Sequence, residues 1–340
     1  MAAGKQEGRG CINAEVNCPQ LLEFPRVQTS AASFSPAFRG TIIRDQPQQP
    51  RLPSGLPQPM GARPHRAYLI YPAVSRYFIP KTENRWPLAA GFRSDAQSVH
   101  GSRTIMVADL SELLLHVPAD SEHEAYRSAI QDENVLGKKT ASTRLWAYTK
   151  LRELYGLDPR LPVFRALRLL WDADSEGQPL LALLAATARD SLLRLTMRAV
   201  IETPVGQELT RERLQDAVVA ARGDRFSATT MKSLLANLTS SWTQSGHLIP
   251  RGRVRALPPT STSAVAFALF LGYLTGARGL LLFSTQWTAL LGLPESRLQD
   301  LAREASRRGW LTYRGIGDVV DITFERFLTP ADVAALAAVS

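Results

Sequence analysis

Cysteine is nearly absent from the sequence, which contains only Cys11 and Cys18 among its 340 residues. A structural zinc site needs four cysteine or histidine ligands, and no further cysteine and no histidine cluster lies at ligand spacing from these two. A small disulfide-stabilised scaffold is also excluded. We therefore expect no metal and no cofactor, and the shortage of cysteine fits a protein of the reducing cytoplasm.

Long apolar runs are also missing. The longest stretch without charge extends from Ala256 to Ala277. Its apolar centre, Val265 to Leu274, is about half of the ~20 residues that a membrane-spanning helix needs. The stretch therefore predicts a buried helix, and we expect no association with a membrane.

No familiar catalytic signature is present. The sequence lacks phosphate-binding loops, dinucleotide-binding glycine patterns, nucleophile elbows and the histidine pairs of zinc enzymes. The acidic residues Asp172, Asp174 and Glu176 could suggest the metal pair of a nuclease, but their position before Gly177 favours the caps and turn of a helix end. We therefore expect a protein that is not an enzyme and that takes no small-molecule substrate.

Positive charge is concentrated in the first third of the chain. The formal net charge is +9, and residues 1–105 hold 13 Lys and Arg against 6 Asp and Glu, whereas residues 106–340 hold 27 against 25. Residues 1–105 are rich in proline and have no helical periodicity, which predicts a disordered leader. An over-long gene start, with translation beginning at Met106, is the alternative. The net charge of residues 106–340 is nearly zero. Any nucleic-acid binding by this part of the chain must therefore depend on where its basic residues lie.

From Met106 onward, apolar residues recur every three to four positions, which is typical of amphipathic helices. Hydroxyl residues precede these runs and glycine or proline follows them, as expected of helix caps. The pattern predicts a helical domain over residues 106–206. Its main helices are expected over residues 140–155, 162–171 and 179–201, the first of them capped by Thr140 or Ser142.

One arrangement of elements occurs twice after the helical domain. In residues 207–257, a helix capped by Thr210 and a longer helix capped by Ser227 precede the segment HLIPRGRVRAL, which predicts a strand, a glycine turn and a strand. In residues 258–328, two further helices precede the segment WLTYRGIGDVVDITF, which predicts a second hairpin. This is the order of a winged helix-turn-helix. The predicted fold is mainly α: a helical domain followed by winged helix-turn-helix-like units with short β-hairpins, and a C-terminal tail over residues 329–340.

Three arginines alternate in the first predicted hairpin. Arg251, Arg253 and Arg255 would all point to one face of an extended strand. In that arrangement they could bind phosphates along the edge of a DNA groove. A solvated strand face is the alternative.

Other basic and polar residues lie at the ends of predicted helices. In a winged unit, the start of the second helix enters the major groove and reads bases. Each group also has a structural alternative, because hydroxyl residues cap helix starts and basic residues at a helix C-terminus stabilise the helix dipole. The candidate DNA-binding residues in these positions are Thr229, Thr230 and Lys232 in the first unit, Ser296, Arg297, Gln299, Arg303, Arg307, Arg308 and Arg314 in the second, and Lys138, Lys139 and Arg144 in the helical domain.

Residues 106–257 carry a succession of features that is found in a known family. They contain a basic, threonine-rich helix start (GKKTAST), a leucine-rich helix with arginines, the run LLALLAATARD and a terminal winged unit. In this succession the chain resembles the BrxA-like accessory proteins of BREX phage-defence systems. The resemblance implies a helical, cytoplasmic protein without catalytic activity, which binds DNA beside other subunits of a defence complex.

Two functions remain open at this point. The first is a non-enzymatic accessory protein of a bacterial phage-defence system that binds double-stranded DNA. The second is a protein–protein interaction scaffold of a defence complex without direct DNA contact, which the near-zero net charge of residues 106–340 favours. Salt distinguishes them, because phosphate contacts weaken steeply with ionic strength whereas a packed protein interface changes little.

Overall fold

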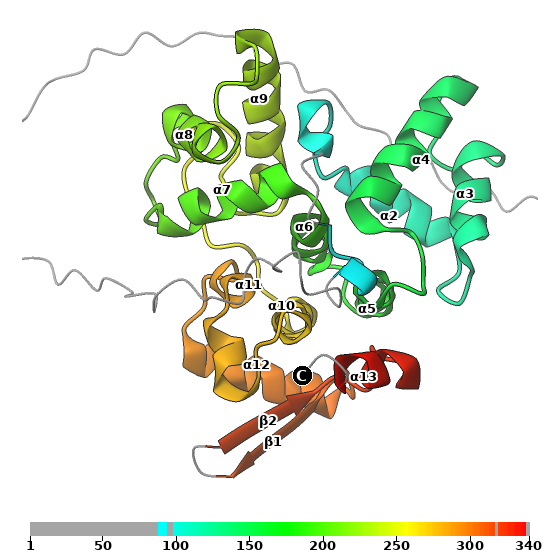
Figure 1. Ribbon diagram of the computed structural model, residues 1–340, viewed down its shortest axis with the longest axis vertical. Coiled ribbons are helices and arrows are strands. Elements are labelled where there is room, and N and C mark those ends of the chain that lie inside the picture. The colour runs from blue at the N-terminus through cyan, green and yellow to red at the C-terminus, as the bar shows by residue number, and fades with distance from the viewer. Residues whose placement is uncertain (1–87, 94–97, 317–318, 338–340) are drawn as a thin grey trace, which may run out of the picture. The chain divides into compact units, whose positions relative to one another are not determined.

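Helices form most of the described chain, because its apolar residues recur at helical spacing and caps bound each run. The structure is a computed structural model that describes residues 88–93, 98–316 and 319–337 (Figure 1). The first elements are η1 (Val99–Gly101), α2 (Val107–His116), α3 (His123–Gln131), α4 (Ala141–Tyr155), α5 (Pro162–Ala173), α6 (Gln178–Arg189) and α7 (Ser191–Glu202). They are followed by α8 (Arg211–Arg222), α9 (Ala228–Gln244), α10 (Thr262–Leu274), η2 (Gly279–Ser284), α11 (Gln286–Ala289), α12 (Glu295–Arg307), β1 (Thr312–Ile316), β2 (Val319–Thr323) and α13 (Pro330–Ala337).

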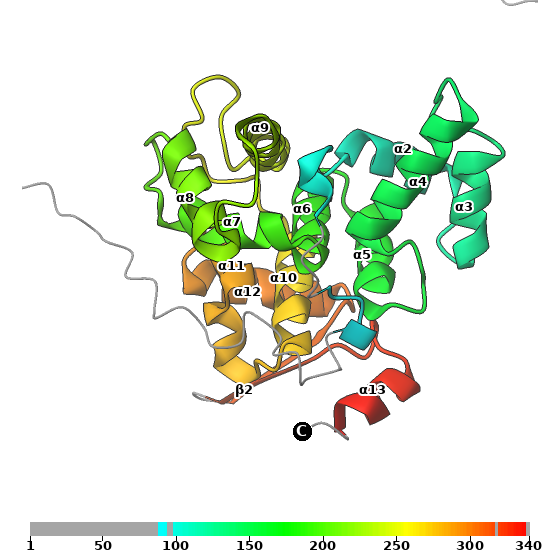
Figure 2. The same ribbon diagram turned by 45° about the horizontal axis from the view of Figure 1, so that its top comes forward.

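Two buried helices, α6 and α10, form the centre of the helical structure. Every residue of α6 from Leu180 to Ala188 is buried, and α10 is buried along its length except at Tyr273. The helix α6 packs on α4, α5 and α7, and α10 packs on α5, α6 and α12 (Figures 1 and 2). The prediction of a buried helix within residues 256–277 is therefore confirmed. Among the described residues, no helix is long and apolar enough to cross a membrane.

The helix predicted over residues 179–201 is in fact two helices, α6 and α7. They separate at Asp190, whose carboxylate accepts a hydrogen bond from Leu193 N (2.9 Å) and so caps α7. Apolar spacing continues across this break, so periodicity did not reveal it, although aspartate is a favoured N-cap. The first predicted helix is confirmed as α4, with Thr140 as its N-cap and Gly156 directly after its last residue.

The folded part of the chain begins before Met106, which corrects the predicted boundary. Phe92, Val99 and Ile105 are at most 3% exposed and belong to the same hydrophobic core as the helices. These residues have no helical spacing, so only their tertiary contacts reveal that they are part of the core. The predicted disorder of residues 1–87 lies outside the described residues.

The second predicted hairpin is confirmed as the antiparallel pair β1 and β2, in which Tyr313 lies opposite Ile322. The strand β2 also packs beside η2. After the hairpin, Phe324 and Phe327 pack on Phe270 of α10, with ring centroids 5.3 and 5.0 Å away. The chain then continues into α13, so the predicted tail contains a helix.

Candidate nucleic-acid interface

A pair of helices, α8 and α9, forms the first part of the region predicted as a winged unit. Thr210 caps α8 by accepting a hydrogen bond from Arg213 N (3.2 Å), and Ser227 caps α9 by accepting one from Thr230 N (3.2 Å). Both predicted caps are confirmed. The two helices are joined by a short turn that contains Gly223, which has a positive φ of 64°.

Two short extended segments follow α9, and they pair with each other and with the residues before α8 at isolated positions. Glu208 is bridged to Val254, and Leu248 is bridged to Arg255, both in the antiparallel sense. The predicted strand pair of residues 247–257 is thus reduced to one bridge, between Leu248 and Arg255. The turn between the two segments contains Gly252, which has a φ of 97°.

The three arginines of this turn do not share one face, which corrects the prediction. Arg251 and Arg253 have positive φ values of 66° and 51°, so the backbone between them is not extended and side-chain alternation fails. Arg255 is only 3% exposed, and its guanidinium donates to Val200 O (3.1 Å) and to His247 O (3.3 Å). Arg255 therefore stabilises the fold and is not available to DNA.

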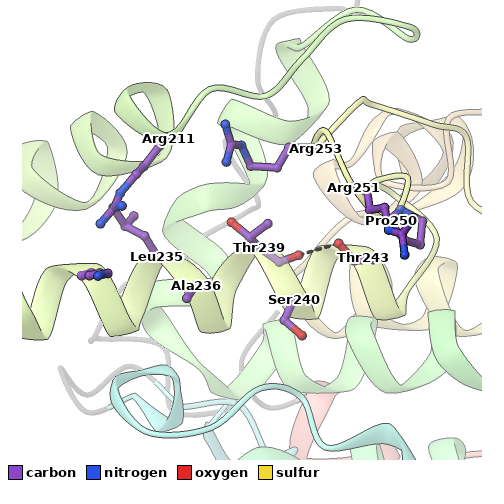
Figure 3. Close-up of a pocket in the computed structure, with 10 residues that line it drawn as sticks. Arg211, Leu235, Ala236, Thr239, Ser240, Thr243, Pro250, Arg251 and Arg253 are labelled. Atoms are coloured by element: carbon purple, nitrogen blue, oxygen red, sulfur yellow. Dashed lines mark hydrogen bonds between the residues drawn. The ribbon is translucent and has the colours of Figure 1, made fainter.

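Arg251 and Arg253 instead line a cavity of about 450 Å³ together with Arg211 and Lys232. We call this cavity the cationic groove. Its remaining lining comes from Pro250 and from one face of α9: Leu235, Ala236, Thr239, Ser240 and Thr243. Arg211 extends from α8 toward α9, and Arg253 points into the same space from the turn, whereas Arg251 lies near Thr243 (Figure 3).

All the charged side chains that line the cationic groove are positive. No carboxylate is among the residues that line it. Arg211, Lys232 and Arg251 are exposed, and none of them forms an ion pair with a residue of the described ranges. Arg253 is paired with Glu208 at 2.5 Å between Nη2 and Oε1. The groove therefore presents three unpaired cations and one paired cation to an anionic ligand.

Sequence reasoning missed Arg211, although a signal for it exists. Arg211 is the first residue of α8, directly after the cap Thr210. A cation at this position is opposed by the positive end of the helix dipole, which favours acidic residues there. An unfavourable charge at an exposed helix start could have marked Arg211 as a candidate binding residue.

The predicted base-reading residues at the start of α9 divide into two groups. Lys232 lines the cationic groove, whereas Thr229 is exposed and does not line it. The hydroxyl of Thr230 lies 2.9 Å from Ser227 Oγ, so it belongs to the helix cap. Of the three, Lys232 is the residue that the structure brings together with the other groove cations.

The basic residues of α12 are largely paired with acids on the same helix. Arg303 pairs with Asp300 (3.0 Å), and Arg307 and Arg308 both pair with Glu304 (2.5 and 3.0 Å). Hydrogen bonds from Arg307 and Arg308 hold the pKa of Glu304 below its usual range. Ion pairs of this kind neutralise a helix face, a role that the predicted alternative of stabilising the helix dipole did not include.

The other candidates of the second unit remain on its surface. Arg297 and Arg314 are exposed, and within the described ranges neither has an ion-pair partner. Arg314 lies opposite Asp321 in the hairpin register. Ser296 is exposed, and Gln299 donates to Glu295 Oε1 (3.0 Å). These residues line none of the cavities that we describe in the structure.

The third candidate cluster lies at the start of α4. Lys138 and Lys139 line a cavity of about 380 Å³ that also contains Arg103 and Trp146. Lys138 is paired with Asp109 (2.7 Å), and Arg103 stacks over the ring of Trp146 at 4.2 Å from its centroid. Arg144 does not line this cavity. Of the cations that line this cavity, Arg103 and Lys139 have no ion pair within the described ranges, compared with three such cations in the cationic groove.

The acidic residues Asp172 and Asp174 have structural partners. Asp172 pairs with Arg168, and Asp174 follows α5 and accepts hydrogen bonds from Ser263 Oγ (2.7 Å) and Gly177 N (3.2 Å). Their interpretation as residues of a helix end is confirmed. Among the described residues, no group of three potential ligands could hold a metal ion.

Ser241, His100 and Asp190 lie in the order of a hydrolase triad but have no access to solvent. His100 Nε2 is 2.9 Å from Ser241 Oγ, and His100 Nδ1 is 3.1 Å from Asp190 Oδ2. All three residues are at most 2% exposed. The hydroxyl of Ser241 donates to Asn237 O and accepts from Ile105 N, so its proton is already engaged. The arrangement connects η1, α7 and α9 and can perform no chemistry on a substrate.

His247 is a buried neutral residue in the first of the two extended segments that follow α9. It is fully buried, with Nε2 2.9 Å from Leu290 O and Nδ1 2.8 Å from Ser245 Oγ. The carbonyl can only accept, so Nε2 carries the proton and Nδ1 accepts from Ser245. Burial first, and the nearby charge of Arg255 second, lower the pKa of His247 to about 3.

We expect this histidine to make the protein less stable in acid. Because the pKa of His247 is about 3 when folded and near 6.5 when unfolded, only the unfolded chain takes up the proton between these values. The free energy of unfolding should therefore fall as pH drops below about 6.5, with a contribution from this residue of up to about 1.4 kcal/mol per pH unit. Urea unfolding at pH 7, 6 and 5 measures this slope in the wild type and in His247→Gln.

The slope should be smaller in His247→Gln by up to the full contribution of the histidine. The variant Leu290→Ala is the matched control, because it removes buried side-chain volume beside His247 without removing a titratable group. It should lower the free energy of unfolding at every pH and keep the slope. An unchanged slope in His247→Gln would show that the residue is not held neutral.

A scan against protein-family models, a search of curated proteins and a search of solved structures find no match for this chain.

Proposed function

We propose that the protein binds double-stranded DNA through the phosphate backbone and has no catalytic activity of its own. The observation that carries this proposal is the cationic groove, in which Arg211, Lys232, Arg251 and Arg253 line one cavity without a carboxylate. A polyanion that contacts several of these cations at once would release bound counterions, which is the main source of affinity for DNA.

The order of elements around the groove supports a winged helix-turn-helix interpretation of this region. The helix pair α8 and α9 is followed by two short antiparallel segments that are joined by the turn at Gly252. In a winged unit, the second helix and the turn are the parts that approach DNA. Both contribute to the lining of the cationic groove, through Lys232 and through Arg251 and Arg253.

The lining of the groove favours a duplex over a single strand. Proteins that bind single-stranded nucleic acids stack the bases on aromatic side chains. None of the residues that line the cationic groove is aromatic. Small hydroxyl residues of α9, Thr239 and Ser240, can instead donate hydrogen bonds to phosphate oxygens.

The resemblance to BrxA-like proteins suggests the biological setting. On that basis we propose that the protein acts in the cytoplasm as an accessory component of a phage-defence system of the BREX type. Its DNA contact would then place other subunits of a defence complex on the same duplex.

A protein-interaction scaffold is the second candidate function, and one observation favours it. Leu280 and Leu281 of η2 and Val319 of β2 are 42%, 51% and 72% exposed. The elements that carry them pack side by side. Exposed apolar residues that gather on one surface are typical of protein interfaces.

The affinity of the full chain for a mixed-sequence duplex, measured at about 50 and 200 mM salt, distinguishes the two functions. DNA binding through three or four phosphate contacts predicts that affinity falls by about 40- to 150-fold over this range. A scaffold that does not contact DNA predicts no binding at the lower salt concentration. Absence of binding there would remove the DNA-binding proposal and leave the scaffold.

A further inference from the structure

Glu208 is the acidic residue whose ion pair reaches into the cationic groove. It lies in the segment before α8, and its backbone is bridged to Val254. A hydrogen bond from Leu209 N to Arg253 O (2.9 Å) holds the same two segments together. Both partners of the ion pair between Glu208 and Arg253 are therefore carried by backbone that is fixed in place.

The ion pair is accessible to a ligand. The side chains of Arg253 and Glu208 are 41% and 49% exposed, so water and anions can reach both of them. An exposed pair of this kind contributes little to stability. Its effect on the charge of the groove is larger, because the carboxylate neutralises one of four cations and leaves three unpaired.

We propose that Glu208 is a built-in competitor for phosphate at Arg253, which limits the affinity of the cationic groove for DNA. A phosphate that approaches Arg253 must displace the carboxylate or stay near it, and two anions at one guanidinium repel each other. Arg211, Lys232 and Arg251 have no such competitor among the described residues. Arg253 then joins the contact only when a polyanion already engages the other three cations, so Glu208 selects against isolated phosphate groups.

This inference rests on the DNA-binding role proposed above, and it makes a separate prediction. Replacing Glu208 with glutamine keeps the shape of the side chain and removes its charge. In Glu208→Gln, the affinity of the full chain for a mixed-sequence duplex should rise by about threefold to tenfold at low salt. The plot of log affinity against log salt concentration should become steeper by about 0.9, the value expected for one additional phosphate contact.

Two comparisons separate the ion pair from a general change in charge. Glu212→Gln is the matched control, because Glu212 is an exposed carboxylate of α8 that does not line the groove and has no ion pair in the described part of the chain. It should change the affinity by less than the Glu208 variant does. In an Arg253→Ala background, Glu208→Gln should give no gain, because the cation that it releases is absent.

Each outcome bears on the inference. A gain that is specific to Glu208 and that depends on Arg253 supports it. An equal gain from Glu212→Gln, a gain that persists without Arg253, or weaker binding by Glu208→Gln would overturn it and leave the DNA-binding role intact. The last of these would mean that Glu208 orients Arg253 toward phosphate. A wild-type protein that does not bind the duplex at all would overturn both the role and the inference.

Discussion

Replacing Asp190 with alanine is expected to lower the free energy of unfolding by about 3 to 5 kcal/mol, because each buried donor that loses its acceptor costs about 1 to 3 kcal/mol. The carboxylate is 2% exposed and accepts hydrogen bonds from Val99 N (2.7 Å), Ser98 Oγ (2.8 Å) and Leu193 N (2.9 Å), besides its contact with His100. Its loss would leave two buried backbone donors and a buried imidazole without their acceptor.

The pKa of Asp190 supports this expectation. Burial by itself would raise this pKa, but His100, through its charge and hydrogen bond, and hydrogen bonds from Leu193 N and Ser98 together hold it well below its usual range. A carboxylate with a lowered pKa stabilises the fold above its unfolded pKa of about 4, and this stabilisation is lost as pH falls further. The effect of Asp190→Ala should therefore be largest at neutral pH.

Thr210→Ala is the matched control, because Thr210 also caps a helix but forms no buried network. Loss of an ordinary cap costs about 1 kcal/mol. Urea unfolding followed by circular dichroism measures both variants, and the difference between them is the contribution of the buried network. Equal losses in the two variants would mean that Asp190 acts only as the cap of α7.

Much of the fold was predictable because the relevant signals are local. The caps Thr140, Thr210 and Ser227 precede apolar runs at helical spacing, and each of them starts a helix. The glycine-flanked segment after α12 forms the predicted hairpin. Signals of this kind depend only on neighbouring residues in the sequence, so they can be read without knowing the tertiary contacts.

The features that escaped prediction depend on distant residues or on unusual backbone angles. His100, Asp190 and Ser241 meet across 141 positions of sequence, and no spacing rule connects them. The alternation argument for Arg251 and Arg253 assumed an extended backbone, which the positive φ angles around the turn do not provide.

Removing the three unpaired cations of the cationic groove is expected to cause the largest loss of DNA binding. In the triple variant of Arg211, Lys232 and Arg251 to alanine, the affinity for a mixed-sequence duplex should fall by at least about 30-fold at ~100 mM salt, because three phosphate contacts are lost. All three side chains are exposed and unpaired within the described ranges, so the fold should not depend on them.

The matched control removes the same charge from another surface. Arg303 and Arg307 of α12 and its cap residue Arg308 pair with Asp300 and Glu304, so they are poor phosphate ligands. Their replacement by alanine should weaken duplex binding by less than about threefold, through the change in net charge alone.

The affinity of these two triple variants and of the wild-type full chain for one duplex, measured side by side, tests directly whether the cationic groove is the DNA-binding site. We predict a large loss in the groove variant, with a flatter dependence on salt, and nearly unchanged binding in the α12 variant. Equal losses in the two variants, or a larger loss in the α12 variant, would contradict the assignment of the groove.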